Sequence, residues 1–295
     1  MCYEEEKMNE GNKPTFMNPF TDFGFKRLFG QEQNKSVLIS FLNALFEQEL
    51  VVEDLMYRDK EQLPESKGSR GVIFDIFCTT ANGEHFILEM QNKKQGHFAD
   101  RALYYVARSI VRQGKQGPWD YTYHAVIGIY FTHFTQAILQ DAFRSDFGIR
   151  RLGADDPHKL QVLTQKIRLV FLQMPLFNKT EEACSSKLDK WMYIIKNMEK
   201  LKTIPWCDQE EFDTIANIAN LNAMSEEERQ RYDDNLRELQ DIYATHLYAR
   251  EEGKQDRSIE IAQSLIQDDC SDAFIAKHTG LSLEDIQTLR SSHEA

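Results

Sequence analysis

Helical spacing of apolar residues appears twice in the first 180 residues. One run predicts a helix over about residues 35–47, whose buried face would consist of Val37, Leu38, Phe41, Leu42, Leu45 and Phe46. The other run predicts a helix from His97 to Gly114, because apolar residues again recur every three or four positions and Gly114 suits a helix end. Each predicted helix has one apolar face, as a helix packed on a sheet would.

Runs of β-branched and aromatic residues between and beyond these helices are typical of strands. They lie at residues 50–56, 72–80, 85–92, 124–132 and 166–173. A polar stretch over 61–70, with Pro64 and Gly68, predicts a loop between the first two strands. The order of helix, three strands, helix and strand predicts an α/β fold with a mixed central sheet flanked by helices.

Strand signals nearly vanish after Thr180, and helical spacing continues toward the C-terminus. Ser225 and Glu228 form a capping box at the start of a long charged helix, and Gly253 is expected to interrupt that helix. The charge alternation of this helix suggests a solvated helix or one packed against a partner helix. The helices are expected at about residues 191–201, 212–221 and 225–266.

Two short helices, at residues 271–278 and 282–289, are expected to form a helix-turn-helix-like tail joined through Gly280. Its only permanent cations are Lys277 and Arg290, which favours a packing module over DNA reading. These patterns divide the chain into three parts. They are a flexible N-terminal arm (1–17), an α/β domain (18–180) and an all-helical C-terminal region (181–295).

Net charge changes sign along the chain. The 295 residues carry 35 Lys and Arg against 47 Asp and Glu, a formal net charge of −12. Residues 91–180, however, hold 13 basic and 6 acidic side chains, whereas both flanking parts are acidic. Because binding to a phosphate backbone depends on local charge, the cationic middle third is compatible with a nucleic-acid partner.

Composition excludes several classes of protein. With 41% hydrophobic and 28% charged residues, neither wholesale disorder nor a collagen-like repeat is expected. The longest apolar runs fall far short of the roughly 20 residues of a spanning helix, so no membrane protein is expected. The acidic N-terminus lacks the apolar core of a secretory signal, which favours a cytoplasmic location. Five widely spaced cysteines indicate free thiols and no zinc site.

Two carboxylates occupy predicted strands. Asp75 lies between Phe74 and Ile76, where an ionised side chain would carry a large desolvation cost unless a cation or hydrogen bonds compensate it. Glu89 lies in a similar setting on the next strand, with Gln91 on the same face. The alternative is that both carboxylates lie on a solvated sheet face without a metal.

The connection between the two strands decides whether these carboxylates meet. A two-residue Asn82-Gly83 turn would send Asp75 and Glu89 to opposite faces. A three-residue loop, Ala81 to Gly83 with Gly83 in the left-handed conformation, would pair them directly. A functional pair therefore predicts the three-residue loop. Adjacent carboxylates could share a Mg²⁺ or Mn²⁺ ion, which can orient and deprotonate a water and neutralise charge on a phosphate.

Asp75 followed by Glu89-x-Gln91, after a helix and a strand and before another helix, resembles the PD-(D/E)XK nuclease superfamily. The chain most resembles its nuclease family transposases, also called the recombination-promoting nuclease family. Further similar segments are Asp22-Phe23-Gly24-Phe25-Lys26-Arg27-Leu28-Phe29-Gly30, Leu38-Ile39-Ser40-Phe41-Leu42-Asn43, Arg101-Ala102-Leu103-Tyr104-Tyr105 and Thr279-Gly280-Leu281-Ser282-Leu283-Glu284-Asp285-Ile286.

The resemblance implies a restriction-endonuclease-like core that cleaves DNA with a divalent metal held by Asp75 and Glu89. It places Gln91 where the wider superfamily has a lysine, and a glutamine cannot supply that positive charge. Lys93, two residues further, could substitute if the strand continues, or be a solvated lysine at the strand end. The implied catalytic residues are thus Asp75, Glu89, Gln91 and Lys93.

The helix over 97–114 carries a stripe of cations around an aromatic residue. Its members, which fall on one helical face and suit a phosphate backbone, are Arg101, Tyr105, Arg108 and Arg112. The alternative is a solvated helix face. Asp22 and Lys26, one helical turn apart, could reach the same cleft or form a local ion pair.

Three hypotheses follow. The first is a Mg²⁺- or Mn²⁺-dependent DNA endonuclease that uses water as nucleophile, and it would work as a homodimer or larger oligomer if both strands are cut. The second is a DNA-binding or protein-interaction module on a degenerate nuclease scaffold. The third is a structural oligomer built by the acidic helical region.

Overall fold

The computed structural model of the protein describes residues 14–62, 72–94, 96–139, 141–151 and 162–293. Contacts divide the chain into two compact units, residues 1–236 and 237–295. The predicted arm over 1–17 lies mostly outside the described residues, but its end packs: Phe16 and Met17 are buried, and the Met17 N–H donates to the Ala219 carbonyl at 2.9 Å. The predicted loop over 61–70 also lies mostly outside the described residues.

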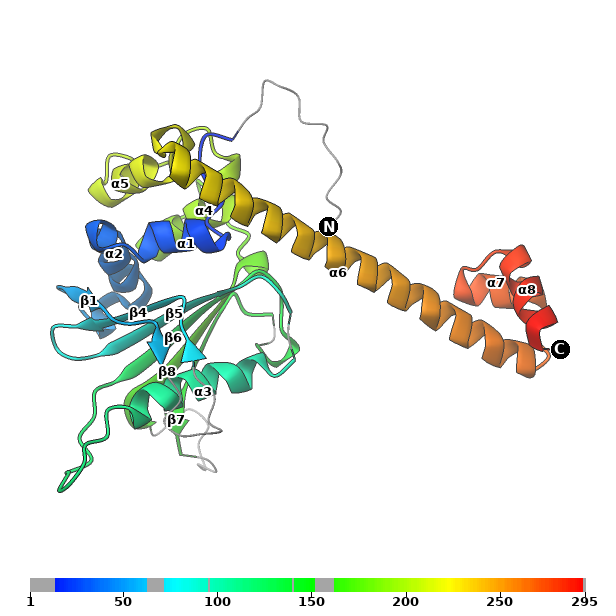
Figure 1. Ribbon diagram of the computed structural model, residues 1–295, viewed down its shortest axis with the longest axis horizontal. Coiled ribbons are helices and arrows are strands. Elements are labelled where there is room, and N and C mark those ends of the chain that lie inside the picture. The colour runs from blue at the N-terminus through cyan, green and yellow to red at the C-terminus, as the bar shows by residue number, and fades with distance from the viewer. Residues whose placement is uncertain (1–13, 63–71, 95, 140, 152–161, 294–295) are drawn as a thin grey trace. The chain divides into compact units, whose positions relative to one another are not determined.

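A six-stranded mixed sheet forms the centre of the first unit (Figure 1). Its order is β1-β4-β5-β6-β8-β7, in which β5, β6 and β8 are parallel neighbours and the remaining pairings are antiparallel. The strands are β1 (Leu55–Tyr57), β4 (Ile76–Thr80), β5 (His85–Gln91), β6 (Val126–Thr132), β7 (Arg144–Arg150) and β8 (Val162–Gln173). A separate two-stranded ribbon joins β2 (Glu61–Gln62) to β3 (Val72–Ile73). The predicted mixed sheet is confirmed.

Helices cover both faces of this sheet (Figure 1). One face packs against α1 (Asp22–Phe29), α2 (Lys35–Phe46), α4 (Lys187–Asn197) and α5 (Glu210–Ala219). The opposite face packs against α3 (Phe98–Val111). The first compact unit extends past the predicted boundary at residue 180 because α4 and α5 pack on α2 and α1. Short 3-10 turns lie at Glu32–Asn34, Glu47–Glu49, Ala137–Leu139, Met174–Leu176, Met198–Lys200 and Leu221–Ala223.

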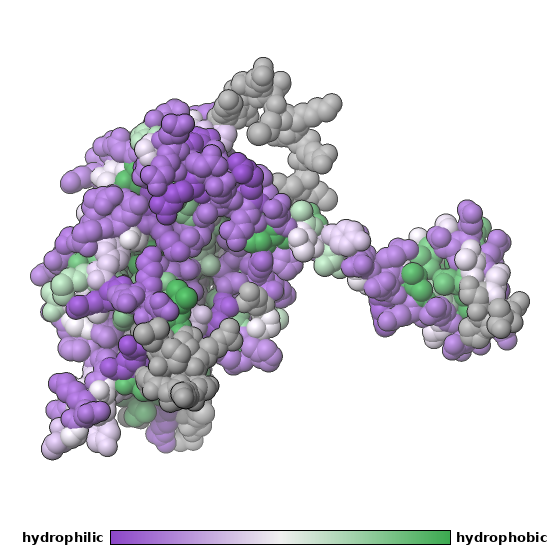
Figure 2. Space-filling model, in the orientation of Figure 1, coloured by the Kyte–Doolittle hydropathy of each residue, from purple (hydrophilic) through white to green (hydrophobic). Residues whose placement is uncertain are grey.

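Strand alternation divides the apolar residues between two cores. On β5, Phe86 and Leu88 belong to the core under the four helices, whereas Ile87 belongs to the core under α3. Glu89 has the same parity as Ile87 and therefore lies on the α3 face. The face of the first unit visible in Figure 2 is mainly hydrophilic, as the 28% of charged residues leads one to expect.

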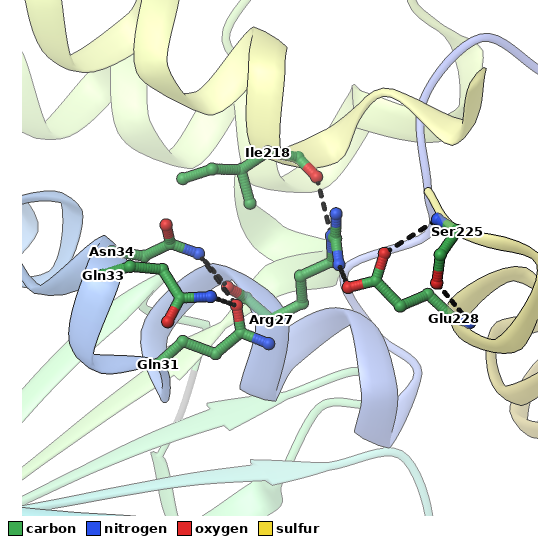
Figure 3. Close-up of polar contacts among 7 residues, drawn as sticks. All are labelled: Arg27, Gln31, Gln33, Asn34, Ile218, Ser225 and Glu228. Carbon is green, nitrogen blue, oxygen red and sulfur yellow. Dashed lines mark hydrogen bonds and ion pairs between the residues drawn. The ribbon is translucent and has the colours of Figure 1, made fainter. Parts of the chain in front are cut away.

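The helix α6 (Glu226–Gln267) begins within the first unit, where polar contacts attach it to α1 and α5 (Figure 3). Arg27 pairs with Glu228, and its Nε donates to the Ile218 carbonyl at 2.9 Å. Glu228 also closes the predicted capping box, since its Oε2 accepts from the Ser225 N–H at 3.0 Å and Ser225 Oγ accepts from the Glu228 N–H at 3.2 Å. The predicted helix start is confirmed.

The second unit contains the rest of α6 with α7 (Asp272–Thr279) and α8 (Leu283–His293). Its small core consists of Ala262, Ile266, Ile275, Leu281 and Ile286. Gly280, at φ +74°, ends α7 as the predicted tail requires. The predicted interruption at Gly253 is wrong: α6 is continuous there, so neighbouring helical residues tolerate the modest cost of one glycine.

No helix in the described ranges combines the length and apolar character needed to cross a membrane.

Candidate active site

The sheet is irregular beside Asp75. The Arg58 N–H donates to the Phe77 carbonyl at 2.8 Å, and two residues later the Lys60 carbonyl accepts from the Phe74 N–H at 3.0 Å. One strand thus advances two residues while the other advances three, which is the geometry of a β-bulge. The single strand predicted over 72–80 is therefore two strands, β3 and β4, separated at Phe74 and Asp75.

This bulge places two aromatic residues on one face although they are three positions apart. Phe74 and Phe77 both belong to the core under α3, with ring centroids 5.3 Å apart. Phe74 also packs edge to face on Tyr105 of α3 at 5.5 Å. The bulge is held by packing, and it frees the backbone and side chain of Asp75 from the regular ladder.

The β4–β5 hairpin has the three-residue loop that a shared site requires. Thr79 pairs with His85, the Thr80 N–H donates to the Glu84 carbonyl at 2.9 Å, and the loop between them is Ala81 to Gly83. Gly83 is at φ +91°, where a side chain would be strained. The predicted loop length and left-handed glycine are confirmed, and the register brings Asp75 opposite Glu89.

The two carboxylates contact the backbone of each other's strand. Glu89 Oε1 accepts from the Asp75 N–H at 3.1 Å, and Asp75 Oδ2 accepts from the Met90 N–H at 2.9 Å. One oxygen of each carboxylate therefore replaces a ladder partner lost at the bulge. The second oxygen of each has no hydrogen-bond partner within the described part of the chain.

Burial strongly affects the ionisation of this pair. Glu89 is only 8% exposed; burial first, and then the charge of Asp75, raise the pKa of Glu89 to about 8. Burial also raises the pKa of Asp75, while a backbone hydrogen bond from Met90 and the charge of Lys26 act to lower it. Asp75 is partly buried, and two carboxylates side by side in such surroundings repel each other, so a cation between them would relieve that repulsion.

Cations from two other elements act on Asp75. Lys26 of α1 forms the local ion pair with Asp22, at 2.5 Å, and both of their charges influence the pKa of Asp75. Lys60 also acts on Asp75, and burial lowers the pKa of Lys60 itself. Lys60 could not be found from the sequence, because it lies in a polar stretch without periodicity; the hydrogen bond from the Phe74 N–H to the Lys60 carbonyl places it next to the bulge.

Gln91 lies two residues beyond Glu89 on the same face, and both ends of its amide are occupied. Its Oε1 accepts from Arg101 Nη2 of α3, and its Nε2 donates to the Lys93 carbonyl at 3.0 Å. β5 ends at Gln91, so Lys93 lies in a bend and not on a continued strand. The condition under which Lys93 was expected to share the face of Glu89 is therefore not met.

The four residues predicted as a DNA-binding stripe on α3 have different surroundings. Arg101 lies near the carboxylates, and its charge lowers the pKa of Glu89. Tyr105 packs on the protein through Phe74. Arg108 is 8% exposed, which leaves little of it for a phosphate, whereas Arg112 is exposed at the helix C-cap.

The donor set suits a hard divalent cation. Asp75 and Glu89 each have one carboxylate oxygen that meets no hydrogen-bond donor of the described residues, and carboxylate oxygens are the ligands that Mg²⁺ and Mn²⁺ prefer. Among the residues that the structure describes, no three His, Cys, Asp or Glu side chains gather to form a metal cage. Magnesium commonly keeps several waters and uses one or two carboxylates, so a pair fits this ion.

A family model described as PD-(D/E)XK nuclease family transposase matches residues 19–249, a range that contains every strand and all the predicted site residues. No match was found among curated proteins or among solved structures. The mixed six-stranded sheet with helices on both faces is consistent with the restriction-endonuclease-like fold of PD-(D/E)XK nucleases. The chain belongs to the PD-(D/E)XK nuclease family transposases.

Proposed function

We propose that this protein hydrolyses phosphodiester bonds of DNA with a Mg²⁺ or Mn²⁺ ion held by Asp75 and Glu89. The observation that carries the proposal is the meeting of the buried Glu89 carboxylate with the partly buried Asp75 carboxylate, through a bulge on one strand and a three-residue loop between strands. A fold that needed only stability would gain nothing from burying two mutually repelling charges. Membership of a nuclease family supports metal binding as the role of this pair.

Hydrolysis needs no covalent protein intermediate. The oxygen of a water attacks phosphorus, one P–O bond forms, the ester P–O bond breaks, one proton leaves the water and one reaches the leaving oxygen. When bound, the metal lowers the pKa of a water and neutralises charge on the phosphate. The carboxylates of Asp75 and Glu89 hold that site in a water-poor environment, where electrostatic effects are larger than in bulk water.

DNA would approach the face of the sheet that α3 covers, near the end of β5. The middle third of the chain, residues 91–180, which begins at the end of β5 and includes α3, has an excess of basic side chains. We propose Arg101 and the exposed Arg112 as DNA contacts, since cations position a phosphate backbone, together with Tyr105, which lies one helical turn beyond Arg101. Cutting both strands at one place would use two copies of the site, which makes a homodimer the expected working form.

The test is cleavage of supercoiled plasmid by purified protein in Mg²⁺, Mn²⁺ or EDTA. Wild type should nick the plasmid in either metal and not in EDTA, and Asp75→Asn and Glu89→Gln should each lose at least 10²-fold in rate. Arg150→Ala is the matched control, because Arg150 is exposed on β7 far along the sheet order from β4 and β5. Its rate should equal that of wild type.

Folded wild type that cuts in neither metal would refute the nuclease proposal. Salt-dependent DNA affinity without cutting would then support the degenerate binding module. Cleavage that persists in both carboxylate variants would refute the assignment of the site.

A further inference from the structure

The contact between Gln91 and Arg101 joins the catalytic strand to α3. Gln91 is two residues beyond Glu89 on β5, and Arg101 lies in the second turn of α3. The Gln91 amide oxygen accepts from Arg101 Nη2, so at least one of its two lone pairs is engaged by the guanidinium. The amide orientation is fixed from the other side by its donation to the Lys93 carbonyl. The amide is thus built to hold the guanidinium.

Aromatic rings fix the guanidinium in the same position. Arg101 Cζ lies 5.3 Å from the ring centroid of Phe98 and 6.0 Å from that of Tyr105. The helix itself is attached to the sheet next to this point, where Tyr130 Oη donates to the Ala102 carbonyl at 2.9 Å. Arg101 therefore has little rotational freedom, because the Gln91 amide and two aromatic rings contact its guanidinium and a hydrogen bond attaches its helix to the sheet. Its charge is preorganised beside Glu89.

We propose that Arg101, positioned by Gln91, supplies the positive charge that a lysine supplies at position 91 in the wider superfamily. Gln91 is then a positioning residue, and the guanidinium is the group that contacts the scissile phosphate. This inference rests on the proposed function. It separates two kinds of arginine on α3: Arg101 stabilises the transition state, whereas the exposed Arg112 only holds the DNA backbone.

The chemistry of the guanidinium suits this task. Arginine stays protonated in proteins and presents donors in a planar fork that matches phosphate oxygens. Arg101 has five N–H donors, and the contact with Gln91 is made by Nη2. The alternative cations fit less well: Lys93 lies past the end of the strand, and Lys60 lies on the Asp75 side with its charge set against that of Lys26.

Single-turnover cleavage of a short duplex, with kcat and KM also measured, tests the assignment. Arg101→Ala should lower kcat about 10²-fold with less than a threefold change in KM, as loss of a transition-state donor does. Gln91→Ala should lower kcat by 10-fold or more. The Gln91→Ala/Arg101→Ala double variant should be no slower than Arg101→Ala alone, because the two side chains act as one unit.

Moving the cation gives a sharper test. In the Arg101→Ala background, Gln91→Lys places the superfamily lysine back on the strand and should recover kcat at least tenfold. In the wild-type background, Gln91→Lys should instead lower kcat, because it sets two cations side by side and removes the amide that holds Arg101. Arg150→Ala controls for loss of an arginine charge, and Arg101→Lys, which keeps the charge and the apolar stem, tests the assignment if Arg101→Ala does not fold.

These measurements separate the proposed role of Arg101 from the nuclease proposal. Cleavage by wild type with unchanged kcat in Arg101→Ala, or an effect confined to KM, would overturn this inference and leave the nuclease proposal intact. Additive losses in the double variant, or no recovery by lysine at position 91, would also overturn it. A kcat loss seen in Lys60→Ala and not in Arg101→Ala would move the role to Lys60. If wild type does not cleave, both proposals fail together.

Discussion

Replacing Glu89 by glutamine should make the metal-free protein more stable while it abolishes activity. In the folded protein Glu89 is buried next to Asp75, and its carboxylate is relieved only in part by Arg101 and Lys26. The amide at position 89 keeps an oxygen for the Asp75 N–H and offers an N–H₂ group to the neighbouring carboxylate. If Glu89 contributed to stability, its replacement by glutamine would instead lower the free energy of unfolding.

The magnitude follows from the pKa of Glu89. The folded protein retains this proton up to about pH 8, whereas the unfolded chain releases it near 4.5, so the folded state binds more protons between these values. Stability therefore falls as the pH rises across that interval. At 1.36 kcal/mol per pH unit, ionisation of Glu89 lowers the free energy of unfolding by about 3 kcal/mol at pH 7. Replacing Glu89 by glutamine removes this penalty and would raise Tm by roughly 6–12 °C.

The assay is urea unfolding of wild type and Glu89→Gln in EDTA at pH 5 and pH 7. The variant should be more stable by about 3 kcal/mol at pH 7, and the difference should shrink to below 1 kcal/mol at pH 5. Added Mg²⁺ should stabilise wild type and leave the variant unchanged, since only wild type has both ligands. A variant less stable than wild type at pH 7, or a difference independent of pH, would refute the electrostatic reasoning.

Three other perturbations follow from the structure. Gly83→Ala should lower the free energy of unfolding by about 2 kcal/mol in urea titrations, because φ is +91° and a Cβ would lie 2.3 Å from His124 Nδ1; an unchanged midpoint would show that the loop adapts. Burial lowers the pKa of His85 to about 4, so the free energy of unfolding of wild type relative to that of His85→Gln should fall by about 2 kcal/mol as the pH drops from 6.5 toward 4; a difference independent of pH in urea titrations would contradict this. Glu228→Gln keeps the capping box but removes the charge beside Arg27, which is only 11% exposed; we expect a loss of about 1–2 kcal/mol, against none for Glu227→Gln, and equal losses would contradict a specific ion pair.

The sequence predicted the part of the site that depends on local geometry. The interval between Asp75 and Glu89, with a glycine at the end of a short loop, determines the strand register and thus a shared face. The helices over 35–47 and 97–114 were predictable because a sheet-packed helix needs one apolar stripe. The hairpin register and the two helices are both determined by residues that lie close together in the sequence.

Features set by tertiary contacts could not be predicted in this way. The bulge at Asp75 lies within an unbroken apolar run, and it depends on the Lys60–Phe74 bond and on packing against α3. The strand predicted at 50–56 begins only at Leu55, because the Asn43 side chain takes both backbone groups of Val52. The edge strand β7 carries polar residues and a glycine and gave no strand signal.

The Gln91–Arg101 contact and the burial of Arg108 are also tertiary. The spacing of the arginines on α3 indicates a common stripe, yet Arg101 contacts Gln91 of β5 whereas Arg108 is enclosed by protein. Helical periodicity tells which residues share a face, but the neighbouring elements decide which part of that face meets solvent.

The most direct test of the Asp75–Glu89 metal site is an anomalous difference map from crystals grown with Mn²⁺ and a short DNA duplex. We predict one strong peak about 2.1 Å from an oxygen of each carboxylate, close to a phosphate of the DNA, and no peak there in Glu89→Gln crystals. Ordered DNA on the α3 side with Mn²⁺ bound elsewhere, and with the two carboxylates still joined only to the backbone, would contradict this prediction.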